Sequence, residues 1–290
     1  MPSVKDLRDR IRSMKNTQQI TKAMKQVAAA KIRRAEVAQK QARPYADALS
    51  RMLNELMSAV SSVDHPFMKP GRSGAPIGVI LMTADKGLCG AFNGNLIRAA
   101  EVLLKTHSDA VFYTVGMKAR NAVRRWGRPD HATWPLNVPT KLDTAREVAA
   151  AATAAFEEGK ISEIILISPK LLSMISQRPE TRRLVPFSQS AESQASQTTA
   201  SSKGAVEFAP SPEFVLSRLL PKYLEFTLFS SMLETDASFF AAQLVAMNNA
   251  TENAGKLIDE YTIQMNNARQ AAITKELLEI VGGAEALSGS

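Results

Sequence analysis

The sequence predicts a mixed α/β fold in which two long terminal helices form an antiparallel coiled coil and an α/β domain is inserted between them. Two observations support this prediction: a long apolar repeat lies near each end of the chain, and strand and helix patterns alternate in the middle. We expect an N-terminal helix over 1–60, a linker over 61–76, an α/β domain over 77–210 and a C-terminal helix over 211–290. Such an arrangement favours mechanical or scaffolding work over chemistry in a pocket.

The C-terminal helix carries the clearest repeat. Apolar or small residues recur there at alternating steps of four and three, which is the spacing of a coiled-coil seam. They are Phe240, Leu244, Met247, Thr251, Ala254, Ile258, Tyr261, Met265, Ala268 and Ala272. We expect this helix to begin near Pro212 and to end near Val281, because Gly282 and Gly283 follow.

The N-terminal helix has a recognisable start, with Ser3 as N-cap and Asp6 three residues later. Its apolar stripe breaks at Thr17–Gln19, and Pro44 either kinks the helix or is absorbed locally. The stripe consists of Val4, Leu7, Ile11, Met14, Ile20, Met24, Val27, Ile32, Ala35, Leu49, Leu53 and Leu56.

The middle of the chain begins, after a Pro- and Gly-rich linker, with the buried strand pattern Ile77–Met82. Further strands are expected at 110–115 and 163–168, and helices at 93–105, 117–126 and 144–158. Alternating strands and helices indicate a small parallel sheet. Arg183–Phe187 and Val206–Phe208 are candidates for a further hairpin, and the Ser- and Gln-rich stretch Ser188–Gly204 between them is expected to be a mobile loop.

Charge is unevenly distributed along the chain. Ten basic and two acidic residues precede Ala35, a net charge of +8 that equals the net charge of the whole chain. From Glu213 to Leu287 the chain has five basic and ten acidic residues. Either the two terminal helices support each other electrostatically, or the first presents a basic face to an acidic partner. Both interpretations remain open at this point.

Several classes of site find little support. Cys89 is the only cysteine, so an intrachain disulfide is impossible and a reducing compartment is expected. The three histidines lack ligand spacing, so we expect no metal and no cofactor. The turn around Gly87 and Gly90 invites a phosphate-binding interpretation, yet neither glycine-rich nucleotide motif is present. An enzyme that uses a nucleotide is therefore a weaker alternative.

A nucleic-acid scaffold is a second alternative, since the first helix is basic. No aromatic residues are interleaved with the basic residues near its N-terminus, however, and its apolar stripe indicates that the helix is half-buried. The chain has no apolar run long enough to span a membrane. It also begins without the apolar region of a signal peptide and without an evident transit peptide, which favours a bacterial source.

Several segments, in order from one end of the chain to the other, resemble the gamma subunits of F-type ATP synthases. The resemblance rests on Lys5–Arg8, Gln19–Lys31, Ala42–Tyr45, Asp85–Asn93, Asn266–Glu276 and Glu279–Ala284. It implies an antiparallel coiled coil of the terminal helices and a Rossmann-like insert that binds no nucleotide.

The resemblance also implies a function. Such a subunit is the non-catalytic central stalk of the enzyme, and it couples proton-driven rotation of the c-ring to ATP synthesis. Its expected partners are three alpha and three beta subunits, the epsilon subunit and the c-ring, and nucleic acid is not among them. The expected location is the cytoplasmic face of the cell inner membrane, where the chain associates with the membrane only through the complex.

The resemblance assigns contact residues one by one. Lys22 and Met24 on the first helix are expected to contact the alpha/beta ring. On the second helix, polar contacts with the ring are expected from Arg269, Gln270, Thr274 and Glu276, and an apolar bearing from Ile280, Val281 and Leu287. Gln243 stands where the family carries an arginine, which puts one ionic contact between stalk and ring in doubt.

Overall fold

The computed structural model describes residues 3–59, 65–187 and 211–288. The chain packs into two compact units. Unit 1 consists of Met1–Ala28 and Gln243–Ser290, and unit 2 of Ala29–Ala242. Two long helices, α1 (Val4–Ala59) and α6 (Pro212–Ser288), contribute to both units. The mixed α/β class with long terminal helices is thus confirmed, while the domain boundaries expected from the sequence stay a prediction.

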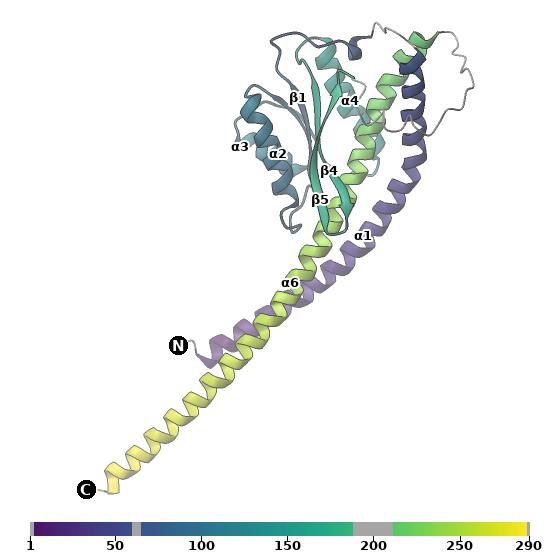
Figure 1. Ribbon diagram of the computed structural model, residues 1–290. Coiled ribbons are helices and arrows are strands. Elements are labelled where there is room, and N and C mark those ends of the chain that lie inside the picture. The colour runs from purple at the N-terminus through teal and green to yellow at the C-terminus, as the bar shows by residue number, and fades with distance from the viewer. Residues whose placement is uncertain (1–2, 60–64, 188–210, 289–290) are drawn as a thin grey trace. The chain divides into compact units, whose positions relative to one another are not determined.

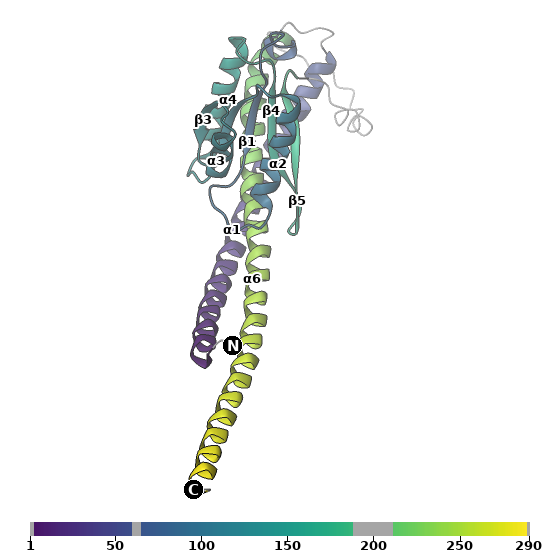
Figure 2. The ribbon, with the colours of Figure 1, turned by 90° about the vertical axis from the view of Figure 1, so that its left-hand side faces the viewer.

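In unit 1 the first turns of α1 lie antiparallel to α6, and both views show them side by side (Figures 1 and 2). The predicted N-cap is confirmed, because the Asp6 backbone N–H donates to Ser3 Oγ at 3.2 Å and the Ser3 N–H donates to Asp6 Oδ2 at 3.1 Å. This reciprocal pair satisfies two donors that would otherwise lack partners at the start of the helix.

The predicted seam of α6 is confirmed over most of its length. Each seam residue from Met247 to Ala268 is buried or half-buried, and most residues between them are exposed. Ala272 is the exception, because it is exposed. Helix α6 continues past the first turn of α1, as Figure 2 shows, and every described side chain after Ala268 is exposed. The seam therefore ends where its partner helix ends.

The stripe predicted on α1 needs a correction. Ile20 and Val27 are 61% and 55% exposed, so they do not lie in the seam. The buried or half-buried positions recur instead at Leu7, Ile11, Met14, Gln18, Thr21, Lys25 and Ala28. The stripe does not break at Thr17–Gln19, because polar side chains continue the seam there. The prediction assigned apolar residues to the seam, whereas the positions that keep the 3.5-residue period here are polar.

Unit 2 contains a five-stranded sheet of order β3-β2-β1-β4-β5. The first four strands are parallel, and β5 pairs antiparallel with β4. The strands are β1 (Gly78–Met82), β2 (Val111–Val115), β3 (Asp130–Trp134), β4 (Ile164–Ser173) and β5 (Ser176–Val185). Every residue of β1 is buried, as a central parallel strand requires.

Helices cover both faces of this sheet, with α2 and α3 on one face and α4 and α6 on the other (Figure 1). The connecting elements are a short 3-10 helix η1 (Pro66–Met68), α2 (Phe92–Thr106), α3 (Met117–Arg125) and α4 (Lys141–Glu157). Alternate residues of each strand enter opposite cores. Ile80 and Met82 face α4 and α6, whereas Val79 and Leu81 face α2 and α3.

Helix α6 takes part in both cores of unit 2. Leu220, Leu224 and Leu228 belong to the core on the α4 face, whereas Phe239 packs with the core on the α2 face. Phe239 lies against Phe92, the first residue of α2, with ring centroids 6.1 Å apart. The segment of α6 in unit 2 is therefore an integral part of the α/β domain.

The two edges of the sheet were predicted poorly. The strand expected at Arg183–Phe187 instead runs from Ser176 to Val185 and pairs with an extended β4. Its supposed partner, Val206–Phe208, and the Ser188–Gly204 loop lie outside the described residues. The other edge strand, β3, was missed. Edge strands bury few side chains, so neither has the apolar pattern that identifies β1 and β4.

The end of α6 also differs from the prediction. Gly282 and Gly283 do not stop the helix, which continues to Ser288. Glycine within a helix costs only about 1 kcal/mol relative to alanine. The residues that follow are Ala284, Glu285, Ala286 and Leu287, which have high helix propensity. Pro44 likewise lies within the continuous α1.

Candidate functional site

A polar layer crosses the coiled-coil seam of unit 1. Lys25 Nζ donates to Asn248 Oδ1 at 2.6 Å, and the Thr21 and Thr251 hydroxyl oxygens lie 2.8 Å apart. Gln18 Nε2 donates to the Thr251 carbonyl oxygen at 3.5 Å. Polar residues at seam positions cost stability but specify register, because a slipped helix would leave them unpaired. The layer therefore fixes the position of α6 along α1 within this unit.

Most of the positive charge of α1 in unit 1 faces solvent. Exposed basic residues are Lys5, Arg8, Arg10, Arg12, Lys15 and Lys22. Arg10 lies over the Tyr261 ring, 5.9 Å from its centroid. Among the described residues of unit 1, no ion pair joins α1 to α6, and the one ion pair there links Lys275 to Glu279 within α6. The interpretation in which the two helices neutralise each other is therefore disfavoured.

The predicted contact residues all belong to unit 1. Lys22 is exposed, whereas Met24 and Gln243 are half-buried. Gln243 lies about 7.5 Å along α6 from Asn248, the partner of Lys25, at about 1.5 Å per residue. The four polar residues predicted to contact the ring are exposed on the last turns of α6; they are Arg269, Gln270, Thr274 and Glu276.

The predicted apolar bearing lies on the same exposed segment. Ile280 and Val281 are 68% and 58% exposed, and Leu287 lies within α6 although its side chain is outside the described part. Further large apolar side chains share this exposure: Ile273, Leu277 and Leu278. A concentration of exposed apolar residues marks an interaction surface.

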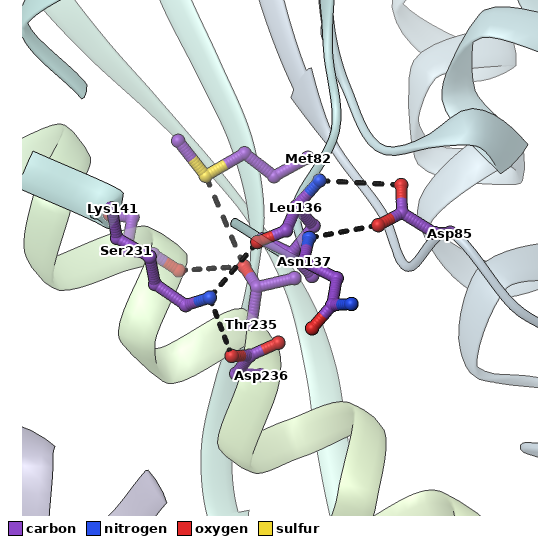
Figure 3. Close-up of polar contacts among 8 residues, drawn as sticks. All are labelled: Met82, Asp85, Leu136, Asn137, Lys141, Ser231, Thr235 and Asp236. Atoms are coloured by element: carbon purple, nitrogen blue, oxygen red, sulfur yellow. Dashed lines mark hydrogen bonds and ion pairs between the residues drawn. The ribbon is translucent and has the colours of Figure 1, made fainter. Parts of the chain in front are cut away.

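The carboxyl end of the parallel strands in unit 2 is where an α/β sheet would bind a nucleotide. Here the Asp85 carboxylate binds three backbone donors, two of which, on Leu136 and Asn137, are drawn in Figure 3. It accepts hydrogen bonds from the backbone N–H groups of Met117 at 3.0 Å, Leu136 at 3.3 Å and Asn137 at 2.8 Å. Donors of this kind hold phosphate in nucleotide-binding domains, and a carboxylate in their place repels it. The geometry therefore disfavours the nucleotide alternative.

A neighbouring ion pair ties α4 to α6 within unit 2. Lys141 Nζ lies 2.8 Å from Asp236 Oδ2 and donates to the Leu136 carbonyl oxygen at 2.9 Å (Figure 3). Both side chains of the pair are largely buried, being 12% and 19% exposed. Burial raises the pKa of Asp236, and Lys141 opposes that rise. The neighbouring Thr235 hydroxyl donates to the Ser231 carbonyl oxygen at 2.6 Å and lies 3.9 Å from Met82 Sδ, which adds a contact between α6 and β1.

A second carboxylate of α6 holds the β4–β5 hairpin. Glu234 Oε1 accepts a hydrogen bond from the Leu171 backbone N–H at 3.0 Å. Burial raises the pKa of Glu234 above its usual 4.5, while that hydrogen bond and the charges of Lys170 and Arg182 work against the rise. The charged form of Glu234 is therefore less favourable in the folded chain than in the unfolded chain.

This raised pKa gives a prediction for Glu234→Gln. A raised folded-state pKa contributes stability that is present below the unfolded value of 4.5 and is lost as pH rises through the folded-state pKa. Glutamine keeps the acceptor for Leu171 and carries no charge. We expect the variant to be more stable than the parent chain at pH 7, with the difference vanishing below pH 4.5. Urea unfolding from pH 4 to pH 8 checks this, and a constant difference across that range would contradict it.

The described residues offer no metal centre, since residues 3–59, 65–187 and 211–288 contain no group of three or more His, Cys, Asp or Glu side chains placed to hold an ion. Within the same residues, no helix combines the length and apolar character needed to cross a membrane. His131 lies in β3, and His65 and His107 cap helices.

Three contacts that hold α6 against other elements were missed from the sequence: the Lys25–Asn248 bond, the Lys141–Asp236 pair and the Glu234–Leu171 bond. A signal existed for the first, because Gln18, Thr21 and Lys25 keep the seam period when polar residues are counted. The other two join residues far apart in the chain, and neither has a local pattern.

Comparison with known proteins agrees with this architecture. A family model described as ATP synthase matches residues 3–287. The ATP synthase gamma chain of Heliobacterium modesticaldum is 41% identical over 291 residues, which cover 99% of this chain and 100% of that one. The ATP synthase gamma chain of Phenylobacterium zucineum is 42% identical over 294 residues, with the same coverage.

Solved structures show the same fold. A chain from the Euglena gracilis mitochondrial ATP synthase (OSCP, F1 and c-ring) matches with a TM-score of 0.68 at 18% identity, over 98% of this chain and 94% of that one. A chain from the central stalk and c-ring of the Tetrahymena thermophila enzyme matches with a TM-score of 0.59 at 23% identity, over 80% and 99%. With the full-length matches at 41% and 42% identity, these findings place the chain in the ATP synthase gamma chain family, which supplies a non-catalytic stalk subunit.

Proposed function

We propose that this chain is the rotor of a bacterial ATP synthase, coupling proton-driven rotation of a c-ring to conformational changes in a catalytic ring of alpha and beta subunits. The full-length similarity to bacterial gamma chains carries the proposal. In this view the chain does no chemistry itself. It transmits torque, which requires helices held in fixed register and a terminal segment that engages another surface.

Two features of unit 1 support the proposal. Hydrogen bonds across the seam resist slippage of α6 along α1, and the Lys25–Asn248 bond is the shortest of them. The exposed apolar end of α6 has no partner helix within the described chain, so Ile280 and Val281 need a socket supplied by other subunits. Basic residues along α1 fit an acidic partner surface.

The contact residues follow from the same proposal. Lys22 and Met24 of α1 would contact the alpha/beta ring. Four polar residues of α6 would contact the same ring: Arg269, Gln270, Thr274 and Glu276. Ile280, Val281 and Leu287 would turn in an apolar bearing. Gln243 is the point of difference, since a neutral amide there replaces an ionic contact by a hydrogen bond, which is weaker than one made by a charged group.

The partners and location are also proposed. Three alpha and three beta subunits would surround one copy of this chain, and the epsilon subunit and c-ring would bind at the foot of the stalk. The complex would hold the chain on the cytoplasmic face of the cell inner membrane, as a peripheral subunit. The full-length similarity of this chain to bacterial gamma chains supports both the proposed partners and the proposed location.

Native mass spectrometry of the chain co-expressed with matched alpha and beta subunits tests the proposal. We expect a complex with three alpha subunits, three beta subunits and one copy of this chain. A control co-expression lacking this chain should give no species of that mass. A chain that stays free, or that copurifies with nucleic acid, would overturn the rotor assignment in favour of the scaffold alternative.

A further inference from the structure

A groove in unit 2 has the character of a small-molecule site. It has a volume of about 440 Å³ and lies between α1, the loop that precedes α4, and α6. Its apolar lining includes Ala35, Ala38, Val138, Leu233 and Phe240. Ligand pockets usually have volumes of roughly 300–1,000 Å³ and mainly apolar walls with a few polar groups. This groove meets both conditions.

The polar groups of the groove are mostly cationic. Lys31 Nζ lies 5.1 Å from the centroid of the Phe240 ring, and Arg34 is exposed beside it on α1. Among the described residues, neither Lys31 nor Arg34 forms an ion pair. Lys141 and Asp236 also line the groove, but they neutralise each other. Lys31 also attracts the Asp236 carboxylate, so the charge is best counted for the lining as a whole: three cations and one carboxylate give a net charge of +2 beside an apolar floor.

The groove also lies at the edge of the sheet where α/β domains bind ligands. Asn137 and Val138 belong to the loop between β3 and α4, at the carboxyl end of the parallel strands. The Asn137 N–H is already bonded to Asp85 (Figure 3), so the backbone at this edge does not offer it to a phosphate. Recognition must therefore come from the cationic side chains and the apolar walls.

We propose that this groove binds an amphiphilic anion, a molecule with one carboxylate head and an unbranched apolar tail. Lys31 and Arg34 would pair with the head, and the tail would lie along Ala35, Ala38 and Leu233. Along α1 the lining extends from Lys31 to Ala38, which is about 10 Å at about 1.5 Å per residue. That length suits a medium-chain carboxylate such as decanoate.

The proposal goes beyond the rotor function and does not depend on it. A bound tail would contact α1, the loop before α4, and α6 at once, all within unit 2. It would therefore add contacts that tie both long helices to the α/β domain. A ligand that binds the folded state alone raises its stability, and the gain grows with ligand concentration.

Isothermal titration of the full-length chain with decanoate, below its micelle concentration, tests the proposal. We expect saturable binding of one decanoate, and about tenfold weaker binding of octanoate because it buries two fewer methylene groups. Decyltrimethylammonium has a similar tail and the opposite charge, so it should not bind. Equal affinity for the anionic and cationic amphiphiles would overturn the proposal.

Matched variants locate the site. Arg34→Gln should weaken decanoate binding about tenfold or more, because it removes a charged donor to the head group. Arg33→Gln removes the same charge from the neighbouring exposed position, which does not line the groove, and should change the affinity little. Equal losses in the two variants would show that decanoate responds to net charge alone, and would overturn the proposed site.

Two further measurements test the position of the bound decanoate without substituting a charged residue. Ala38→Trp fills the groove and should abolish decanoate binding while circular dichroism shows an unchanged helix content. Decanoate should also protect Lys31 from acetylation, detected by mass spectrometry, and leave the exposed Lys40 on the same helix unprotected. Binding that survives in Ala38→Trp, or protection that is equal at both lysines, would place the amphiphile elsewhere.

Discussion

Replacing Lys141 by methionine should destabilise the chain by about 3–5 kcal/mol, because the substitution leaves the Asp236 carboxylate buried without its cation. Methionine keeps most of the volume of lysine, so the effect reports on charge rather than on a cavity. Lys141 is the first residue of α4, where a cation opposes the helix dipole. Lys141 therefore stabilises the fold through its ion pair with Asp236 on α6, and not through an effect on α4. Urea unfolding of the full-length chain at pH 7 measures the change.

The penalty should depend on pH. Loss of Lys141 removes the charge that opposes the rise in the Asp236 pKa, so that pKa moves further above its usual 3.8. A group whose pKa is raised in the folded state contributes stability at pH values below its unfolded-state pKa. That contribution is lost as the pH rises through the folded-state pKa. The Lys141→Met variant should therefore lie furthest below the parent chain at pH 7 and approach it near pH 4. A penalty that stays constant over this range would contradict the explanation.

Two controls separate this pair from ordinary surface charges. The double variant Lys141→Met with Asp236→Leu should recover much of the lost stability, because neither buried charge remains. Lys160→Met should change stability by less than about 1 kcal/mol, since Lys160 and its partner Glu158 are 64% and 55% exposed. A double variant no more stable than Lys141→Met would show that the charge of Asp236 is not the cause.

The sequence was a good guide wherever one local repeat determines packing. The α6 seam from Met247 to Ala268 follows the coiled-coil period, and the predicted strand Ile77–Met82 is found as the central strand β1 over Gly78–Met82, because this run has no polar side chain. The errors on α1 have a physical cause. Ile20 and Val27 are apolar yet exposed, whereas Gln18 and Thr21 hold the seam because partners on α6 bond to them. Hydrophobicity alone cannot identify a polar seam position.

The contacts that tie α6 to the sheet could not be predicted in the same way. Asp236 and Glu234 resemble ordinary polar residues of an amphipathic helix, and their partners Lys141 and Leu171 lie far away in the sequence. Only the packing of α6 onto the sheet brings them together. The proposed contacts at Arg269, Gln270 and Ile280 present the opposite case. They were assigned by resemblance, and their exposure on the described chain is compatible with partners that lie outside it.

Truncation after Gln270 should abolish most coupled ATP synthesis while leaving unit 2 as stable as before. The residues removed include the exposed Ile273, Leu277 and Ile280, which pack against no other element of the described chain. Their loss therefore costs the isolated chain little, whereas the proposed bearing disappears from the complex. Proton-driven ATP synthesis in reconstituted vesicles gives the functional measurement, and urea unfolding of the same variant gives the structural one.

Two substitution variants identify which part of the segment matters. Ile280→Ser with Val281→Ser removes apolar surface, and Thr274→Ala with Glu276→Ala removes polar contacts at unchanged helix length. If the bearing is the main contact, the serine pair should lower ATP synthesis more than the alanine pair, since buried apolar area contributes about 25 cal/mol per Å² when it leaves water. Normal coupled synthesis in the truncated chain would mean that torque passes through α1 and the rest of unit 1, with the end of α6 dispensable.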